Sequence, residues 1–294
     1  MYKKVLVGVD FRQGGRDAVA LAQTLMDPHG SMTLVHVQPA QFLPSHRVTA
    51  EIADEERERG QRQLEAERDQ TGVEAELVLA QGPSPFRVLH EHAERRAADL
   101  LVLGSCHRGA FGRAMLGDDT RGALNGAPCA VAVAPAGYAE RRKPPAKIGV
   151  GYNGSPDSEV ALHAARELAA SSGAQIAVFH LVGLPGYAYG AIGAAVLVNL
   201  ETRLEEAQKE LQELDGVEGR AEYGLSTDLA DLAEGVDLLV VGSRGYGPWG
   251  RLVHGSTSNR LARHTRGPLL IVPRATASSG DAATAERAGE TVSV

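Results

Sequence analysis

The stretch Leu238-Leu239-Val240-Val241-Gly242-Ser243-Arg244-Gly245 decides the fold, together with Gly255-Ser256-Thr257-Ser258, which follows after nine intervening residues. The uncharged run predicts a buried strand, and the glycines end it abruptly. Glycines let the backbone approach an anion closely, and the first N–H groups of a following helix have no intrahelical partner. The hydroxyl residues after Gly255 can donate to the same anion or cap the helix. The pattern therefore predicts a phosphate-binding turn.

Two common nucleotide motifs do not fit this turn. A Walker loop requires a lysine before its Ser or Thr, and no lysine precedes Ser256. The dinucleotide fingerprint of three glycines with a later acidic residue also fits poorly. The turn on its own is thus a phosphate site of unassigned type.

The same pattern occurs twice in the chain. Residues Leu100 to Gly117 align without a gap on Leu238 to Gly255. Leu-Leu-Val and Gly-Ser recur, and an aromatic residue followed by Gly-Arg holds the same place in both copies, as Phe111 and Trp249. A repeat of this length indicates a tandem duplication.

Strand and helix patterns alternate through each half. The first half has predicted strands at Val5–Asp10, Met32–Val37, Glu74–Leu79, Leu100–Leu103 and Cys129–Ala134, and helices at Arg16–Leu25, Thr49–Thr71 and Phe86–Arg96. The second half has strands at Lys147–Asn153, Gln175–Leu181, Gly219–Tyr223, Leu238–Val241 and Pro268–Val272, and helices at Ser158–Ala170, Leu200–Leu214 and Thr227–Glu234. Such alternation predicts right-handed crossovers and parallel strands. We therefore predict an α/β fold of two tandem doubly wound domains, each an open, mostly parallel five-stranded sheet with helices on both faces.

Composition places the domain boundaries. The first domain is predicted at residues 1–135 and the second at 147–274. Residues 136–146, rich in Pro and charged residues, read as an exposed linker. Residues 275–294 have little to bury and read as a disordered tail.

Charge and hydropathy exclude several classes of function. A net charge of −7 with 4% aromatic residues argues against nucleic-acid binding. Leu168 to Leu200 contains no charged residue, but its Pro and Gly residues favour a strand, a loop and the start of a helix over a membrane span. The chain has two cysteines without metal-site spacing and no signal peptide at its start, so we expect a cytoplasmic protein.

The glycine turn and several other segments of the chain resemble those of a known protein family. Gly242, Gly245, Gly255 and Ser256 are spaced like the G-x2-G-x9-G-(S/T) nucleotide motif of the universal stress protein family. The Val-Gly-Val-Asp opening, the Ser155–Ser158 segment and the Ala-Asp-Leu-Leu-Val run before Gly-Ser resemble that family as well. The resemblance covers both halves. It implies an ATP-binding protein, and Mg²⁺ would accompany the triphosphate on chemical grounds.

The resemblance also implies a site in the second half. Residues implied at phosphate and ribose are Gly242, Gly245, Gly255, Ser256, Thr257 and Ser258, and Arg244 is a further candidate for nucleotide binding. Residues implied around the nucleoside are Gly151, Tyr152, Asn153, Leu181 and Val241. The family usually has Asp where this chain has Asn153, which keeps the acceptor oxygen and lacks the charge.

The first half departs from the motif. His107 replaces the second glycine, and Asp118 replaces the Ser. A carboxylate at a helix N-terminus would occupy the N–H groups that a phosphate uses. The remaining candidates in this half, for a weakened or differently specific site, are Asp10, Val37, Gly104 and Gly117. We expect one competent ATP site, in the second half.

No grouping of nucleophile, base and orienting residue emerges, so we expect at most slow ATP hydrolysis. The leading hypothesis is an ATP-binding stress-response or signalling module with a surface read by a protein partner. A nucleotide-free interaction scaffold and an enzyme of adenylate chemistry stay open as alternatives. The resemblance implies that the last strands of the two halves pair, Val131–Ala134 beside Leu269–Val272, around a pseudo-twofold axis. Homodimerisation of the whole chain is left open.

Overall fold

The computed structural model describes residues 1–39, 50–105, 122, 124–183, 194–224, 228–243, 261 and 267–274. In the first half the elements are β1 (Tyr2–Gly8), α1 (Gln13–Leu25), β2 (Met26–Pro39), α2 (Ala50–Thr71), β3 (Glu76–Gly82), α3 (Pro85–Arg96), β4 (Leu100–Gly104) and β5 (Ala130–Ala134). A short helix, α5 (Tyr138–Arg141), lies in the linker. The second half contains β6 (Lys147–Gly151), α6 (Pro156–Ser172), β7 (Gln175–Val182), α7 (Ala194–Gln212), β8 (Glu218–Tyr223), α8 (Asp228–Leu232), β9 (Leu238–Ser243) and β10 (Leu269–Pro273).

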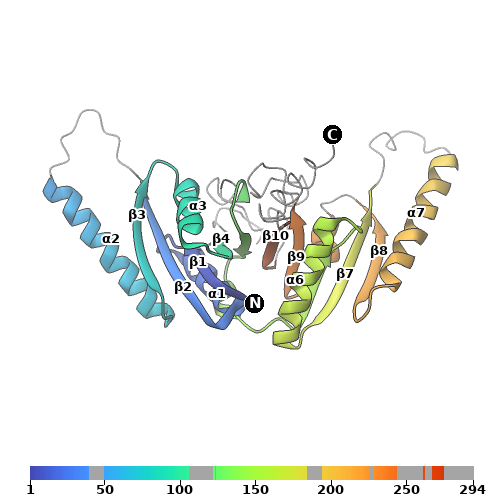
Figure 1. The fold of residues 1–294 in the computed structure, drawn as a ribbon, viewed down its shortest axis with the longest axis horizontal. Coiled ribbons are helices and arrows are strands. Elements are labelled where there is room, and N and C mark those ends of the chain that lie inside the picture. Colours follow the sequence, from blue (N-terminus) through green and yellow to red (C-terminus); the bar gives the residue numbers. More distant parts are fainter. Residues whose placement is uncertain are drawn as a thin grey trace, which may run out of the picture.

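The strands form one ten-stranded sheet in the order β3-β2-β1-β4-β5-β10-β9-β6-β7-β8 (Figure 1). Each half is a doubly wound, parallel five-stranded unit, which confirms the predicted fold class. The predicted elements are all present, with ends shifted by a few residues. The starts of β2 and α7 differ most, each lying six residues before its predicted position. β2 starts at Met26, directly after α1, and reaches the predicted strand through an irregular register opposite β1.

The two halves meet through their last strands. β5 and β10 are antiparallel, with Leu269 opposite Val133 and Ile271 opposite Val131. The pairing implied by the family resemblance is therefore confirmed. It covers an edge strand of each half that would otherwise be free to pair with another chain.

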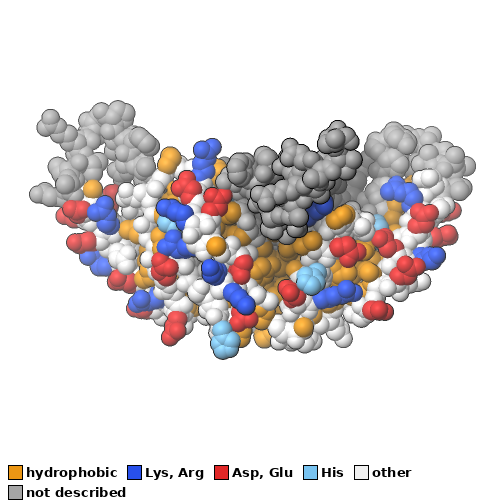
Figure 2. All heavy atoms as spheres, viewed as in Figure 1, with side chains coloured by type: hydrophobic (Ala, Val, Ile, Leu, Met, Phe, Trp, Pro, Cys, Tyr) orange, Lys and Arg blue, Asp and Glu red, His pale blue; other side chains and the backbone are white. Residues whose placement is uncertain are grey.

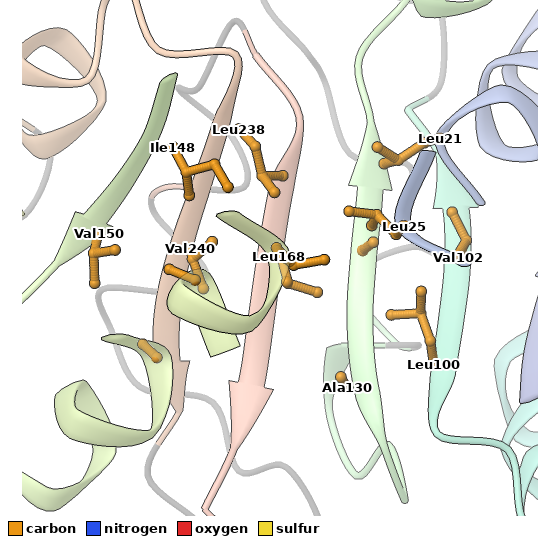
Figure 3. Packing of buried hydrophobic residues seen from close by; sticks show 14 of the residues in the cluster. Leu21, Leu25, Leu100, Val102, Ala130, Ile148, Val150, Leu168, Leu238 and Val240 are labelled. Carbon is orange, nitrogen blue, oxygen red and sulfur yellow. The ribbon is translucent and has the colours of Figure 1, made fainter. Parts of the chain in front are cut away.

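Two hydrophobic clusters, one on each face of the sheet, run through both halves. One joins buried residues of α1 and α6 to alternate residues of the central strands, including Leu25, Leu100, Leu168 and Leu238 (Figure 3). The other lies under α3 and α8 and includes Leu101 and Leu239. Because each cluster continues across the β5–β10 boundary, the two halves share the hydrophobic core on both faces of the sheet.

The linker differs from the prediction because its first part is docked. Asp17, fully buried in α1, accepts hydrogen bonds from the N–H groups of Gly137 at 2.9 Å and Ala139 at 2.8 Å. The Tyr138 hydroxyl donates to Thr24 Oγ1 at 3.2 Å. A buried carboxylate needs such donors, so α5 is held against α1. Residues 142–144 are exposed, as predicted for the linker as a whole.

Among the described residues, no helix is long and apolar enough to cross a membrane. The uncharged stretch from Leu168 contains the end of α6, then β7, and the start of α7, as predicted. The predicted tail, 275–294, lies outside the described residues.

Candidate nucleotide site

The strand order reverses between β6 and β9 in the second half, since β7 lies on the other side of β6. Ligands of open α/β sheets bind beyond the carboxyl ends of the strands at such a reversal. Gly151, the last residue of β6, pairs with Val241 of β9, one residue before Gly242. The glycine turn thus leaves the sheet at the place where the fold favours a ligand. β1 and β4 form the corresponding reversal in the first half.

Three of the residues predicted around the nucleoside lie on the face of the sheet that α8 covers. A Cβ atom on Gly151 would stand 2.8 Å from Leu229 Cδ2 of α8 and 3.1 Å from Val241 Cγ1. Leu181, half-buried at the end of β7, packs in the same cluster. Gly151 and Val241 therefore lie side by side, and Leu181 lies on the same face of the sheet. In the first half Val37 is half-buried on the matching face.

Tyr152 points to the opposite face. Its side chain is 5% exposed in the cluster under α6, and its hydroxyl donates to Glu159 of α6. Burial raises the pKa of Tyr152, and the hydrogen bond and charge of Glu159 raise it further. Successive strand residues point to opposite faces, so Gly151 and Tyr152 cannot both present their Cβ sides to one ligand. The side chain of Tyr152 is thus turned away from the face that holds Gly151, and its main-chain N–H donates to the Phe179 oxygen at 2.9 Å.

In both halves, the polar residue after the first strand accepts hydrogen bonds from other residues of the turn that it begins. Asn153 Oδ1 accepts from the N–H of Ser155 at 3.3 Å and from its hydroxyl at 2.6 Å. Asp10 Oδ1 accepts from the N–H groups of Arg12 at 3.1 Å and Gly15 at 3.2 Å. These bonds tie the turn to the first turn of the next helix. The acceptor oxygen of Asn153 is therefore occupied, and its amide N–H₂ is the group left for a ligand.

Gly242 lies against the start of α6. A Cβ atom on it would stand 2.0 Å from the main-chain oxygen of Asp157. Gly104 repeats this in the first half, where the atom would stand 2.0 Å from the oxygen of Gly14 in α1. A side chain cannot fit at that separation. The first glycine of the motif therefore has a packing role in both halves, which spacing alone did not reveal.

The rest of the predicted phosphate site lies outside the described residues. These positions are Arg244, Gly245, Gly255, Ser256, Thr257 and Ser258, and Gly117 in the first half. Their assignment stays a prediction from the sequence.

The sequence-based prediction did not include a histidine that lies next to the site. His180 precedes Leu181 on β7, and its Nδ1 lies 3.6 Å from Glu210 Oε2 of α7. Burial lowers the pKa of His180, and Glu210 opposes that effect. In the first half His36 precedes Val37, and the Phe11 ring lies on it with ring centroids 4.0 Å apart. The repeat contained the signal, because a histidine stands at the same place in each second strand.

The described residues offer little for nucleophilic or metal chemistry. No three His, Cys, Asp or Glu side chains among them are grouped as a metal site. Cys129 is buried, and burial raises the pKa of its thiol to about 12, so it is protonated at neutral pH. Cys106 lies outside the described residues.

A doubly wound α/β unit with a glycine turn at its strand reversal, built twice in one chain, defines a tandem Rossmann-like protein. The profile of the universal stress protein family matches residues 1–135 and 145–273, and the chain belongs to this family. A universal stress protein of Mycobacterium tuberculosis is 30% identical over 206 residues, which cover 68% of each chain.

Solved structures agree on the fold. A universal stress protein from Archaeoglobus fulgidus superposes with a TM-score of 0.65 at 18% identity, covering 92% of this chain and 98% of that one. A protein of unknown function from Pseudomonas aeruginosa superposes with a TM-score of 0.60 at 15% identity, covering 93% of each. At these identities the likeness bears on the fold alone.

Proposed function

We propose that the protein is a nucleotide-responsive stress or signalling protein that binds ATP at the carboxyl edge of its second half. The β6–β9 reversal, the placing of Gly151, Leu181 and Val241 on one face of the sheet, and the glycine spacing after β9 all support this site. Mg²⁺ would enter with the triphosphate, whose oxygens supply most of its ligands.

The comparison between the two halves carries the proposal. Gly104 and Gly242 are both required by packing, so the first glycine says nothing about a ligand. The second glycine and the Ser differ: the chain has His107 and Asp118 in one half and Gly245 and Ser256 in the other. Both halves form the same strands around this turn, so the fold does not require Gly245 or Ser256. A phosphate contact explains their presence in the second half.

In this proposal the nucleotide acts by occupancy. Its binding would alter a surface that a protein partner reads. No described group is placed as a nucleophile or general base beside the turn, which favours a binding role over rapid turnover.

Mass spectrometry of nucleotide released from freshly purified protein tests the proposal. Bound ATP supports it. ADP or AMP produced by rapid turnover would instead indicate an enzyme. Neither retained nucleotide nor measurable affinity for MgATP would contradict it.

An interaction scaffold without nucleotide is the second candidate, and one observation favours it. Gly242 and Asn153, two residues of the predicted site, are already engaged by packing and by their own turn. If every glycine of the motif served only packing or turn formation, the purified protein would contain no nucleotide and would not bind it.

A further inference from the structure

A cavity of about 310 Å³, here the junction cavity, lies where the linker meets the second half. It opens at the start of β9, at the opposite end of that strand from the glycine turn. Its apolar walls include Pro135 and Tyr138 on the linker side and Ala233, Leu239 and Pro268 on the other. A volume at the lower end of the range for ligand sites suits a small molecule.

The linker wall of the junction cavity is fixed by buried contacts. Asp17 holds the main chain of Gly137 and Ala139, and Pro135 is itself buried. The cavity therefore exists because the two halves are joined in one chain and the linker is docked. None of the described residues of the proposed nucleotide site lines it.

Opposite charges stand on the two walls. Arg141 and Lys143 belong to the linker wall, and Asp231, Glu234 and Asp237 belong to the wall formed by α8 and the following turn. Lys143 Nζ pairs with Asp237 Oδ1 at 2.8 Å, and Asp237 Oδ2 accepts from the N–H groups of Ala146 and Lys147. Lys143 and Asp237 therefore neutralise each other. Arg141 then supplies the positive charge of the linker wall, and Asp231 is one of the carboxylates on the opposite wall.

Arg141 is oriented by its own linker. Its Nε donates to the Gly137 oxygen at 3.2 Å and its Nη2 to the Ala136 oxygen at 2.9 Å. Within the described part of the chain, its guanidinium forms no ion pair. Its remaining N–H groups suit a carboxylate, for which a guanidinium is well shaped.

We propose that the junction cavity binds a small zwitterion with an apolar body, of the size and chemistry of an aliphatic amino acid. The carboxylate of the ligand faces Arg141, its ammonium group faces Asp231, and its side chain contacts Ala233, Leu239 and Pro268. Occupancy would join the linker to α8 and so stiffen the connection between the halves.

Three related probes test the proposal on the full chain: L-leucine, 3-methylbutylamine, which lacks the carboxylate, and 4-methylpentanoate, which lacks the ammonium group. NMR titration follows the amide signals of Tyr138 and Val236. We expect saturable binding of L-leucine, and affinities weaker by about tenfold or more for the other two, since each loses one charge-assisted contact. No saturable binding of L-leucine, or equal binding of all three probes, would overturn the proposal.

Variants locate the binding. Ala230→Leu fills the cavity from the surface of α8 and should abolish L-leucine binding, whereas Ala170→Leu, on the exposed side of α6, should not. Arg141→Gln should weaken the binding of L-leucine and 4-methylpentanoate but not of the amine. Asp231→Asn should weaken the binding of L-leucine and the amine but not of 4-methylpentanoate. Glu140→Gln, exposed on α5, is the control for the linker. The assignment would be refuted if Ala230→Leu and Arg141→Gln both bound L-leucine with unchanged affinity. Ala230→Leu tests the space in the cavity, and Arg141→Gln tests the charge on its wall.

Discussion

Gly242 lies so close to Asp157 that a Cβ atom would stand 2.0 Å from the Asp157 main-chain oxygen. The first turn of α6 rests directly on the end of β9 at this point. The same contact joins Gly104 to Gly14 in the first half. The nucleotide motif thus combines two kinds of glycine, one required by the fold and one, Gly245, that the first half replaces with His107.

Gly242→Ala should destabilise the protein by about 1–3 kcal/mol, because the main chain of α6 must move to admit a methyl group. Urea denaturation measures the change. Gly183→Ala is the matched control, since nothing lies within 4 Å of the added atom, and it should change the free energy of unfolding by less than about 0.5 kcal/mol. A neutral effect of Gly242→Ala would contradict the packing role.

Asp17→Ala should destabilise by about 2–4 kcal/mol, because it leaves the N–H groups of Gly137 and Ala139 without their acceptor. The released linker should also be cut faster by trypsin, after Arg141 and Arg142. Asp17→Asn keeps one acceptor oxygen, so its stability and its cleavage rate should lie between those of the wild type and Asp17→Ala. Glu140→Ala, exposed in the same linker, should match the wild type in both assays. Wild-type cleavage rates in Asp17→Ala would show that the linker is held by other contacts.

Ala97→Gly should stabilise the protein by about 0.5–1 kcal/mol. Ala97 ends α3 with φ of 48°, in the left-handed region, where a Cβ atom is disfavoured. The residue is exposed, so the substitution loses little packing. Thermal and urea unfolding should both shift upward, and Ala97→Val should shift them downward. A loss of stability in Ala97→Gly would show that its methyl group packs.

Glu67 should make stability fall as the pH rises above its ordinary pKa. The side chain is buried, and burial raises its pKa above the ordinary value of 4.5, with Asp10 adding to the effect and Arg16 opposing it. Arg16 Nε lies 3.9 Å from Glu67 Oε1, too far for a hydrogen bond. Between the ordinary and the raised pKa, the folded state binds more protons than the unfolded state, so raising the pH favours unfolding.

Glu67→Gln should remove this dependence. Its free energy of unfolding relative to the wild type should rise over the range from below the ordinary carboxyl pKa of 4.5 to neutral pH, as the wild-type carboxylate ionises. Urea denaturation across that range measures the difference. Glu65→Gln, exposed on the same helix, should give a flat difference. A flat difference for Glu67→Gln as well would mean that Arg16 fully compensates the buried charge.

Much of the fold was predictable because its signals are local or repeated. Alternating strand and helix patterns gave the element order, and the alignment of Leu100–Gly117 on Leu238–Gly255 gave the duplication. The β5–β10 pairing followed from the family resemblance. Asp17 was not predictable, because a lone carboxylate within an apolar helix gives no sign that a linker 120 residues away supplies its donors.

The candidate site was predictable in part. The strand reversal pairs Gly151 with Val241, and Leu181 lies on the same face of the sheet. Tyr152 shows the limit: the family resemblance implied a place for it around the nucleoside, and the alternation of strand side chains directs its side chain into the core under α6. The packing of Gly242 on Asp157 depends on the approach of a helix, which spacing in the sequence does not encode.

Calorimetric titration of the full chain with MgATP tests the central claim most directly. We expect one tight equivalent per chain. Gly245→Val combined with Ser256→Asp should abolish it, whereas the matched changes His107→Val and Asp118→Asn in the first half should leave it intact. Two tight equivalents per chain, or binding that survives Gly245→Val with Ser256→Asp, would contradict the assignment of a single ATP site to the second half.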